Sequence, residues 1–276
     1  MEAEEVEVSL PMEKLNLGFN EIGASSTKAD EGKKFVVLVA TGSFNPPTYM
    51  HLRMFELARD ALSAECYHVL GGYMSPVNDA YKKKGLVSSE HRIQMSYLAC
   101  KSSDFVMVDP WEARQGVWQR TLNVLSRVKN SLSTNEIGTG GPVKVMLVCG
   151  SDLLESFGIP GFWVREQVRA ICRDYGIVCI RREGQDIQRI IENDDILMEN
   201  KSNIRIVDEL IPNQISSTRI RDCISQGRSV KYLTADEVID YIKQHHLYCL
   251  SSTIICMTLH YSLSTSSTGK VIMSKI

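Results

Sequence analysis

Short apolar runs alternate with amphipathic stretches along most of the chain. The first run spans Phe35 to Ala40, and similar runs occur at 67–73, 105–108, 143–149, 176–180 and 204–207. Continuous apolar runs of this length, β-branched in part, are typical of strands that are buried on both faces of a sheet. The pattern therefore predicts a buried strand at each of these positions.

Helical spacing of apolar residues fills the segments between these runs. The expected helices span residues 51–63, 89–101, 117–130, 163–174, 186–192, 216–226 and 235–245. Thr234 is the expected N-cap of the last helix, because Asp236 and Glu237 follow in its first turn. Alternating strands and helices indicate an α/β fold, a Rossmann-like, doubly wound parallel sheet with helices on both faces. Ligands of such sheets bind beyond the carboxyl ends of the strands, so the loops that begin at 41, 74, 109, 150 and 181 are the candidate binding loops.

The two ends of the chain do not follow the α/β pattern. Residues 1–32 are polar and acidic, and we expect a mobile leader there. Residues 33–248 form the expected folded domain. Residues 249–276 are rich in Ser and Thr around a short apolar patch, and we expect a disordered tail or an alternative terminus.

Composition excludes several classes of protein. The chain has 276 residues, 43% of them hydrophobic and 23% charged, which is typical of one globular α/β domain with appendages. A net charge of -2 gives no strongly basic field, so no nucleic-acid partner is expected. No apolar run approaches the roughly 20 residues of a membrane span, and no secretory or transit signal is visible, which favours the cytosol or the nucleus. The eight cysteines lack zinc-site spacing; buried thiols in a reduced compartment are favoured, although the even count leaves disulfides open.

The loop after the first predicted strand carries the first candidate site. Gly42 allows the backbone to approach a ligand closely, and two prolines at 46 and 47 precede the expected helix start. Thr48 is placed to cap that helix, and His51 then lies in its first turn. Free N–H groups and the helix dipole favour an anion here, and a histidine donates hydrogen bonds to phosphate. The alternative is a proline-rich turn with a surface histidine.

A second candidate anion site lies between Ile215 and Arg221. Hydroxyl groups and two arginines gather where a helix is expected to begin, and arginine binds phosphate through two parallel hydrogen bonds. The alternative is a well-capped surface helix with ordinary arginines.

Three further segments suit a nucleotide. Lysines 82–84 are placed to neutralise a phosphate, although a solvated basic loop is the usual interpretation of such a run. Trp118 and Trp163 offer flat faces on which a ligand ring can stack, although core packing is the usual interpretation of such residues. Asp152 follows an apolar strand and is placed either to accept from ribose hydroxyls or to cap a helix.

These segments together resemble a known family. The stretch from Gly42 to His51 is similar to the GxFxPPTxxH signature of the nucleotidyltransferase superfamily, and the stretch from Ile215 to Arg221 resembles its ISSTxxR signature. With the other segments, the chain resembles nicotinamide/nicotinate-nucleotide adenylyltransferases, the plant forms especially, from about Phe35 to Tyr248. Ser151 stands where the family often has alanine, a small change in size.

The resemblance implies roles for individual residues. His51 and Arg221 are the implied catalytic residues, which stabilise the triphosphate and the leaving pyrophosphate. No protein metal ligand is implied, because Mg²⁺ is expected to be held by ATP and water. The implied ATP and phosphate contacts are Gly42, Ser43, Phe44, Thr48, Gly150, Asp152, Arg182, Asn213, Ser217, Thr218 and Arg219. The implied mononucleotide contacts are Lys83, Trp118, Thr121, Phe162 and Trp163.

The implied activity is adenylyl transfer in NAD biosynthesis. ATP and nicotinamide or nicotinate mononucleotide are the expected substrates, and NAD or nicotinate adenine dinucleotide and pyrophosphate are the products. No nucleic-acid or membrane partner is expected, and a homo-oligomer is compatible with the sequence. One rival is a sibling transferase whose acceptor is phosphopantetheine or a choline or glycerol phosphate. The other is a nucleotide-binding or chaperone-like protein with a vestigial site.

Overall fold

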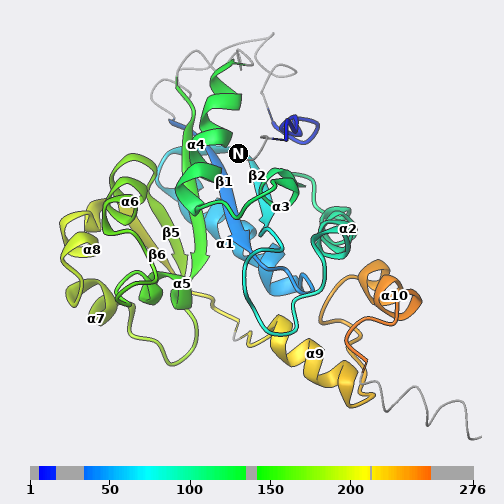
Figure 1. Cartoon of the computed structure of the whole chain (residues 1–276). Coiled ribbons are helices and arrows are strands. Elements are labelled where there is room, and N and C mark those ends of the chain that lie inside the picture. Colours follow the sequence, from blue (N-terminus) through cyan, green and yellow to red (C-terminus); the bar gives the residue numbers. More distant parts are fainter. Residues whose placement is uncertain (1–5, 17–33, 135–141, 212, 250–276) are drawn as a thin grey trace, which may run out of the picture.

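Six parallel strands form one sheet in the computed structural model, which describes residues 6–16, 34–134, 142–211 and 213–249 (Figure 1). The order of the strands is β3-β2-β1-β4-β5-β6, so the order reverses between β1 and β4. This is the doubly wound arrangement that the alternation of strands and helices predicted. The strands are β1 (Lys34–Gly42), β2 (Tyr67–Pro76), β3 (Val106–Val108), β4 (Lys144–Gly150), β5 (Ile177–Ile180) and β6 (Ile204–Val207).

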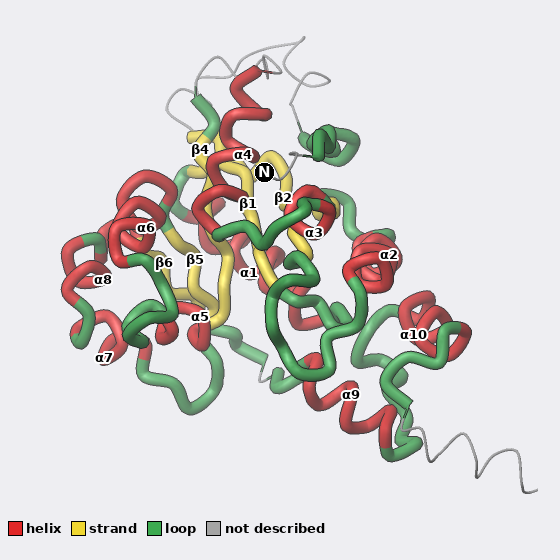
Figure 2. Tube along the Cα trace, viewed as in Figure 1, coloured by secondary structure: helices red, strands yellow, loops and turns green. Residues whose placement is uncertain are grey.

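Helices follow the strands and lie on both faces of the sheet (Figure 2). A π-helical turn, Ile171–Tyr175, continues α6, and a 3₁₀ turn, Lys201–Asn203, precedes β6. The α-helices are α1 (Tyr49–Ala64), α2 (Ser89–Cys100), α3 (Trp111–Arg114), α4 (Thr121–Thr134), α5 (Ser151–Ser156), α6 (Arg165–Ala170), α7 (Ile187–Glu192), α8 (Asp195–Glu199), α9 (Ser217–Ser225) and α10 (Asp236–Gln244).

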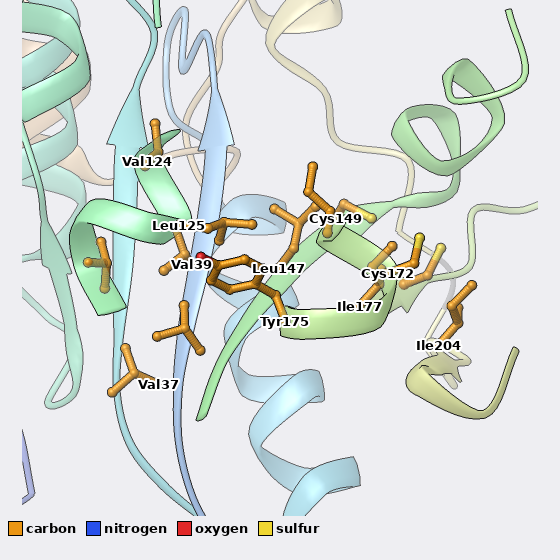
Figure 3. Close-up of a cluster of buried hydrophobic side chains, with 14 of the residues drawn as sticks. Val37, Val39, Val124, Leu125, Leu147, Cys149, Cys172, Tyr175, Ile177 and Ile204 are labelled. Carbon is orange, nitrogen blue, oxygen red and sulfur yellow. The ribbon is translucent and has the colours of Figure 1, made fainter. Parts of the chain in front are cut away.

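The side chains of β1 alternate between two hydrophobic cores. Val37 and Val39 lie in a cluster with residues of α4 and of the π-helical turn (Figure 3). Val36 and Leu38 point to the other face, where they pack against α1. This alternation follows from the two-residue period of a strand, and it explains why the whole run is apolar. The central strand is thereby fixed from both sides, and its carboxyl end is held in place.

The structure differs from the sequence prediction at several helices. The helix expected at 117–130 begins only at Thr121, so Trp118 lies in a loop. Thr234 is not an N-cap: Ala235 occupies that position, and the Thr234 hydroxyl donates instead to the carbonyl of Pro47 at 2.9 Å. The short helices α3, α5 and α8 were not predicted, because four to six residues show too little periodicity.

The N-terminal segment (residues 6–16) packs against the domain, in contrast to the mobile leader expected over 1–32. Leu10 is buried in the cluster of Figure 3, and Val8, Met12 and Leu15 pack against it. The apolar residues inside the acidic leader account for this docking. Residues 1–5 and 17–32 of the expected leader and residues 250–276 of the expected tail lie outside the described residues.

The cysteines in the described ranges are all free thiols, and those at 100, 149, 172 and 179 are buried. Burial raises the pKa of the Cys100 thiol to about 12, which favours the unreactive protonated form. Within the same ranges, none of the helices combines the length and the apolar character that crossing a bilayer requires.

Candidate active site

A cavity of about 480 Å³ opens where the strand order reverses, beyond the carboxyl ends of β1 and β4. Its volume lies in the range typical of small-molecule sites, and its position is the one that doubly wound sheets use for ligands. Most of the residues proposed from the sequence line this cavity: Gly42, Ser43, Phe44, His51, Lys83, Trp118, Thr121, Gly150, Asp152, Phe162, Trp163 and Arg182.

His51 is fixed at the start of α1 by a reciprocal cap. The Thr48 hydroxyl accepts from the His51 backbone N–H, and His51 Nδ1 accepts from the Thr48 backbone N–H at 2.9 Å. The sequence prediction that Thr48 caps this helix is confirmed. Because Nδ1 accepts, the ring hydrogen of neutral His51 lies on Nε2, the nitrogen left for a ligand. Burial, with the positive charges of Arg182 and Lys83, lowers the pKa of His51 to about 4, so the ring is a neutral donor at pH 7.

Cationic side chains converge on the cavity around His51. Lys83 Nζ lies 3.2 Å from Ser43 Oγ, and burial together with the charge of Arg221 lowers the Lys83 pKa. Arg182 forms a 2.6 Å ion pair with Asp152, and both side chains are about half exposed. The excess positive charge indicates a site for a polyanion.

Two glycines of the cavity wall allow neighbouring side chains to pack closely against the backbone. A Cβ on Gly150 would lie 3.3 Å from Nε of Arg182, and a Cβ on Gly42 would lie 3.2 Å from the Phe44 ring. Phe44 itself has a positive φ of 42°, a backbone conformation that is strained for a bulky residue and that recurs at functional sites. Arg182 and the first loop can therefore pack closely because Gly150 and Gly42 have no side chains.

The second candidate anion site, the segment from Ile215 to Arg221 (the late motif), lies at the start of α9 and is hydrogen-bonded directly to the first loop. Ser217 Oγ donates to the carbonyl of Pro46 at 2.7 Å, and Arg221 Nη1 donates to the carbonyl of Asn45 at 2.8 Å. These bonds bring the two anion motifs together, although the late motif does not itself line the cavity.

The other candidates of the late motif are arranged around that contact. The hydroxyl of Thr218 accepts from Arg221 Nη2 at 3.3 Å, and both Thr218 and Arg219 are exposed. Asn213 Oδ1 accepts from the backbone N–H of Ile215 at 2.9 Å, which shapes the loop that leads into α9. These positions leave their polar groups accessible beside the cavity.

Aromatic side chains form one side of the cavity mouth. Trp163 is held in place: its Nε1 donates to Ser156 Oγ at 3.0 Å, and its ring packs edge-on against Phe157 with the centroids 4.7 Å apart. Trp118 and Phe162, by contrast, are 40% and 68% exposed. A tryptophan held by these contacts, together with two exposed aromatic rings in the lining of the same cavity, suits the binding of a flat ligand ring.

Two fully buried polar residues brace the first loop, and the sequence analysis did not single them out. Asn45 Nδ2 donates to the carbonyl of Gly85 at 2.8 Å, and its Oδ1 accepts from the hydroxyl of Tyr248 at 2.8 Å. Arg92 donates to the carbonyl of Ser43 at 3.3 Å and forms a 2.8 Å ion pair with Asp79. The only sequence signal was a charged residue on the otherwise apolar face of the 89–101 helix.

Glu112 is a further cavity residue that the sequence interpretation missed. It lies on α3, it is 3% exposed, and its Oε2 has no hydrogen-bond partner among the described residues. Burial raises the pKa of this carboxyl well above its usual range, and the positive charge of Arg92 opposes that shift. An acidic residue directly after Trp111, beside a predicted loop, was the available signal.

Replacement of Glu112 by glutamine is expected to increase the stability of the protein relative to wild type, and this difference should grow as the pH rises. The folded state favours the neutral acid, so wild-type stability is complete below the unfolded pKa of about 4.3 and declines as the pH rises towards the folded pKa. Glutamine does not titrate. The difference in melting temperature, variant minus wild type, should increase by about 2 °C or more between pH 4 and pH 8 in calorimetry. A difference that stays constant with pH, like that of exposed Glu166→Gln, would contradict the buried neutral carboxyl.

Comparison with known proteins agrees with this geometry. Residues 39–223 match the cytidylyltransferase-like family, and the fold and the site together define a nucleotidyltransferase. The chain is 65% identical over 243 residues to the nicotinamide/nicotinic acid mononucleotide adenylyltransferase of Arabidopsis thaliana. This match covers 88% of this chain and 98% of the Arabidopsis protein. The protein of the same name from Oryza sativa subsp. japonica is 60% identical, with coverage of 89% and 96%. The chain belongs to the family of nicotinamide/nicotinic acid mononucleotide adenylyltransferases.

A solved structure supports the fold independently. The nicotinic acid mononucleotide adenylyltransferase of Plasmodium falciparum, complexed with NaAD, superposes with a TM-score of 0.57 at 19% sequence identity. The match covers 78% of this chain and 97% of that one. This match confirms the predicted fold, and the two plant relatives confirm the family that the sequence motifs indicated.

Proposed function

We propose that this protein transfers the adenylyl group of ATP to nicotinamide or nicotinate mononucleotide. The observation that carries the proposal is the convergence of His51, Lys83 and Arg182 on one cavity whose mouth is formed by Trp118 and Trp163. The two cations, Lys83 and Arg182, and the neutral N–H donor of His51 suit the phosphate groups of ATP and of a mononucleotide, and the tryptophans suit a cationic pyridine ring. The relatives in Arabidopsis and Oryza carry the corresponding name.

The proposed step is an in-line displacement at the α-phosphorus of ATP. A phosphate oxygen of the mononucleotide forms the new P–O bond, the bond between the α-phosphorus and the bridging oxygen breaks, and pyrophosphate leaves with the electron pair. Such transfers depend on positioning and charge neutralisation more than on covalent catalysis. Backbone and hydroxyl groups of Gly42, Ser43 and Phe44 contact the phosphates in this proposal, and Lys83 holds the mononucleotide phosphate.

A divalent cation fits this site as a companion of ATP. Within the described residues, no group of three or more His, Cys, Asp or Glu is arranged to hold a metal ion, and Asp152 is already paired with Arg182. The side chains of this cavity suit Mg²⁺ that arrives bound to the triphosphate of ATP and keeps several of its water ligands. When bound, Mg²⁺ neutralises phosphate charge, and the protein supplies Nε2 of His51 and the guanidinium of Arg221 beside it.

The test is incubation of the purified protein with ATP, Mg²⁺ and either nicotinamide or nicotinate mononucleotide. Chromatography should show dinucleotide and pyrophosphate in equal amounts, and the ratio of the two rates gives the preferred acceptor. Phosphopantetheine and choline or glycerol phosphate serve as alternative acceptors. Pyrophosphate formed only with one of those acceptors, or ATP binding without turnover, would overturn the proposal.

Trp118→Ala is expected to raise the KM for the mononucleotide by about 10-fold, since stacking on an aromatic ring contributes about 1–3 kcal/mol per base. The KM for ATP should change little. Steady-state kinetics with one substrate varied at a time measures both constants. Trp111→Phe is the matched control, because Trp111 is buried nearby but does not line the cavity. Equal mononucleotide KM values in Trp118→Ala and wild type would remove Trp118 from the binding site.

A further inference from the structure

The N-terminal segment (residues 6–16), the dark blue coil in Figure 1, is hydrogen-bonded to the domain at several positions along its length. The backbone N–H of Asn16 donates to the carbonyl of Leu70 at 2.8 Å, and the Tyr73 hydroxyl donates to the carbonyl of Pro11 at 2.7 Å. Lys14 Nζ donates to three backbone carbonyls at 2.7, 2.8 and 3.2 Å, those of Cys100, Ser103 and Val106. With Leu10 buried in the core, these contacts fix the course of the segment.

The beginning of this segment pairs with Gln115. The backbone N–H of Val6 donates to Gln115 Oε1 at 3.1 Å, and Gln115 Nε2 donates back to the carbonyl of Val6 at 2.9 Å. The same Nε2 group donates to the carbonyl of Trp111 at 3.1 Å. Gln115 is only 6% exposed, so its amide depends on these protein partners rather than on water.

Gln115 is also the first residue of the loop that carries Trp118. The loop runs from the end of α3 at Arg114 to the start of α4 at Thr121. Residues 116–118 are exposed, whereas Gln115 is buried, and its own carbonyl accepts from Asn78 Nδ2 at 2.5 Å. Gln115 therefore anchors the loop to the protein interior just before the exposed part of the loop. The N-terminal segment supplies part of this anchor through the hydrogen bonds of Val6.

We propose that the N-terminal segment, acting through Gln115, positions the Trp118 loop for the mononucleotide. Gln115 is a positioning residue: it does not line the cavity, and it sets the direction in which the loop leaves α3. The inference rests on the proposed function, in which Trp118 contacts the pyridine ring. If Gln115 loses its partner, the loop samples orientations that do not bind, and the apparent affinity falls by the fraction of time lost.

Two variants of the full enzyme test the proposal. Deletion of residues 1–6 removes both partners that Val6 offers, and Gln115→Leu removes the side-chain amide while it keeps a similar volume. Both should raise the KM for the mononucleotide by about 5-fold, which corresponds to a loop in its binding orientation about one fifth of the time. The KM for ATP and kcat at saturation should stay within about twofold. Tyr73→Phe, which breaks the segment's bond at Pro11 but not at Gln115, is the matched control.

Limited trypsin digestion supplies a readout that does not depend on activity. Arg114 and Arg120 flank the loop, so both variants should be cleaved there several times faster than wild type and Tyr73→Phe. Unchanged cleavage and unchanged KM in both variants would overturn the proposal. So would an equal effect in Tyr73→Phe, which would assign the effect to general loosening of the segment. Faster cleavage with an unchanged mononucleotide KM would also overturn the proposal. Failure of the proposed function would be recognised separately, because the wild-type enzyme would then form no dinucleotide.

Discussion

His51→Ala is expected to lower kcat for dinucleotide formation by about 100-fold to 1000-fold, the usual effect of deleting one fixed donor to a developing negative charge. The KM for the mononucleotide should change by less than about 3-fold, because the proposed role of His51 is toward the triphosphate. Its Nδ1 is committed to the Thr48 N–H, so the Nε2 hydrogen is presented to the cavity without reorganisation. Single-turnover measurement of dinucleotide formation separates this effect from product release.

Two controls distinguish catalysis by His51 from its role in the helix cap. Alanine also removes one arm of the capping box, which costs about 0.5–2 kcal/mol of stability, whereas glutamine is a usual residue at that position and keeps the arm. Both variants should remain folded in thermal melts, with His51→Gln close to wild type. Because the pKa of His51 is about 4, the plot of kcat/KM against pH should show no titration of this group between pH 6 and 8. Near-normal turnover in His51→Ala would exclude it from the mechanism.

Arg221→Ala is expected to lower kcat/KM for ATP by about 100-fold or more, in line with arginines that stabilise phosphoryl-transfer transition states. Arg221 spans the gap between α9 and the first loop, with one bond to the carbonyl of Asn45 and one to the Thr218 hydroxyl. Its loss removes a positive charge and also one of the hydrogen bonds that join the two anion motifs, while the bond from Ser217 to Pro46 remains. The mononucleotide KM should change much less, since Lys83 remains.

Substitutions at neighbouring positions make this result interpretable. Arg221→Lys keeps the charge but not the paired donors, so it should recover only part of the activity. Arg228→Ala removes an exposed arginine three residues beyond the C-terminal end of the same helix and should leave the kinetics unchanged. Equal losses in Arg221→Ala and Arg228→Ala would indicate a general charge effect and contradict a specific role for Arg221.

The sequence predicted the parts of this fold that depend on local pattern. The strand at Val36 to Ala40 is buried on both faces, and that requirement alone makes the run apolar. Thr48 was assigned from cap chemistry, and that assignment placed His51 in the first turn of the helix. The anion motifs were visible for the same reason, because each is a short segment next to a helix start.

The parts that escaped prediction are set by contacts between distant segments. Asn45 and Gln115 are ordinary amides in the sequence, and only the fold brings them to partners 203 and 109 residues away. The helix expected from residue 117 begins only at Thr121, and the loop before it starts with an extended backbone at Gln115. Glu112 was overlooked because a carboxylate next to a loop is usually solvated, and only burial makes it unusual.

The hydrogen bond between Asn45 and Tyr248 has a consequence for biosynthesis of the protein. A chain that emerges from the ribosome can complete its parallel sheet once β6 has been made, well before Tyr248 is added. The first loop obtains its partner from Tyr248 only after that residue has left the ribosome, so the sheet can mature before the site does. A nascent chain that is stalled between these two points should therefore have a protease-resistant sheet but no activity. Synthesis of a few dozen more residues should then make the enzyme active.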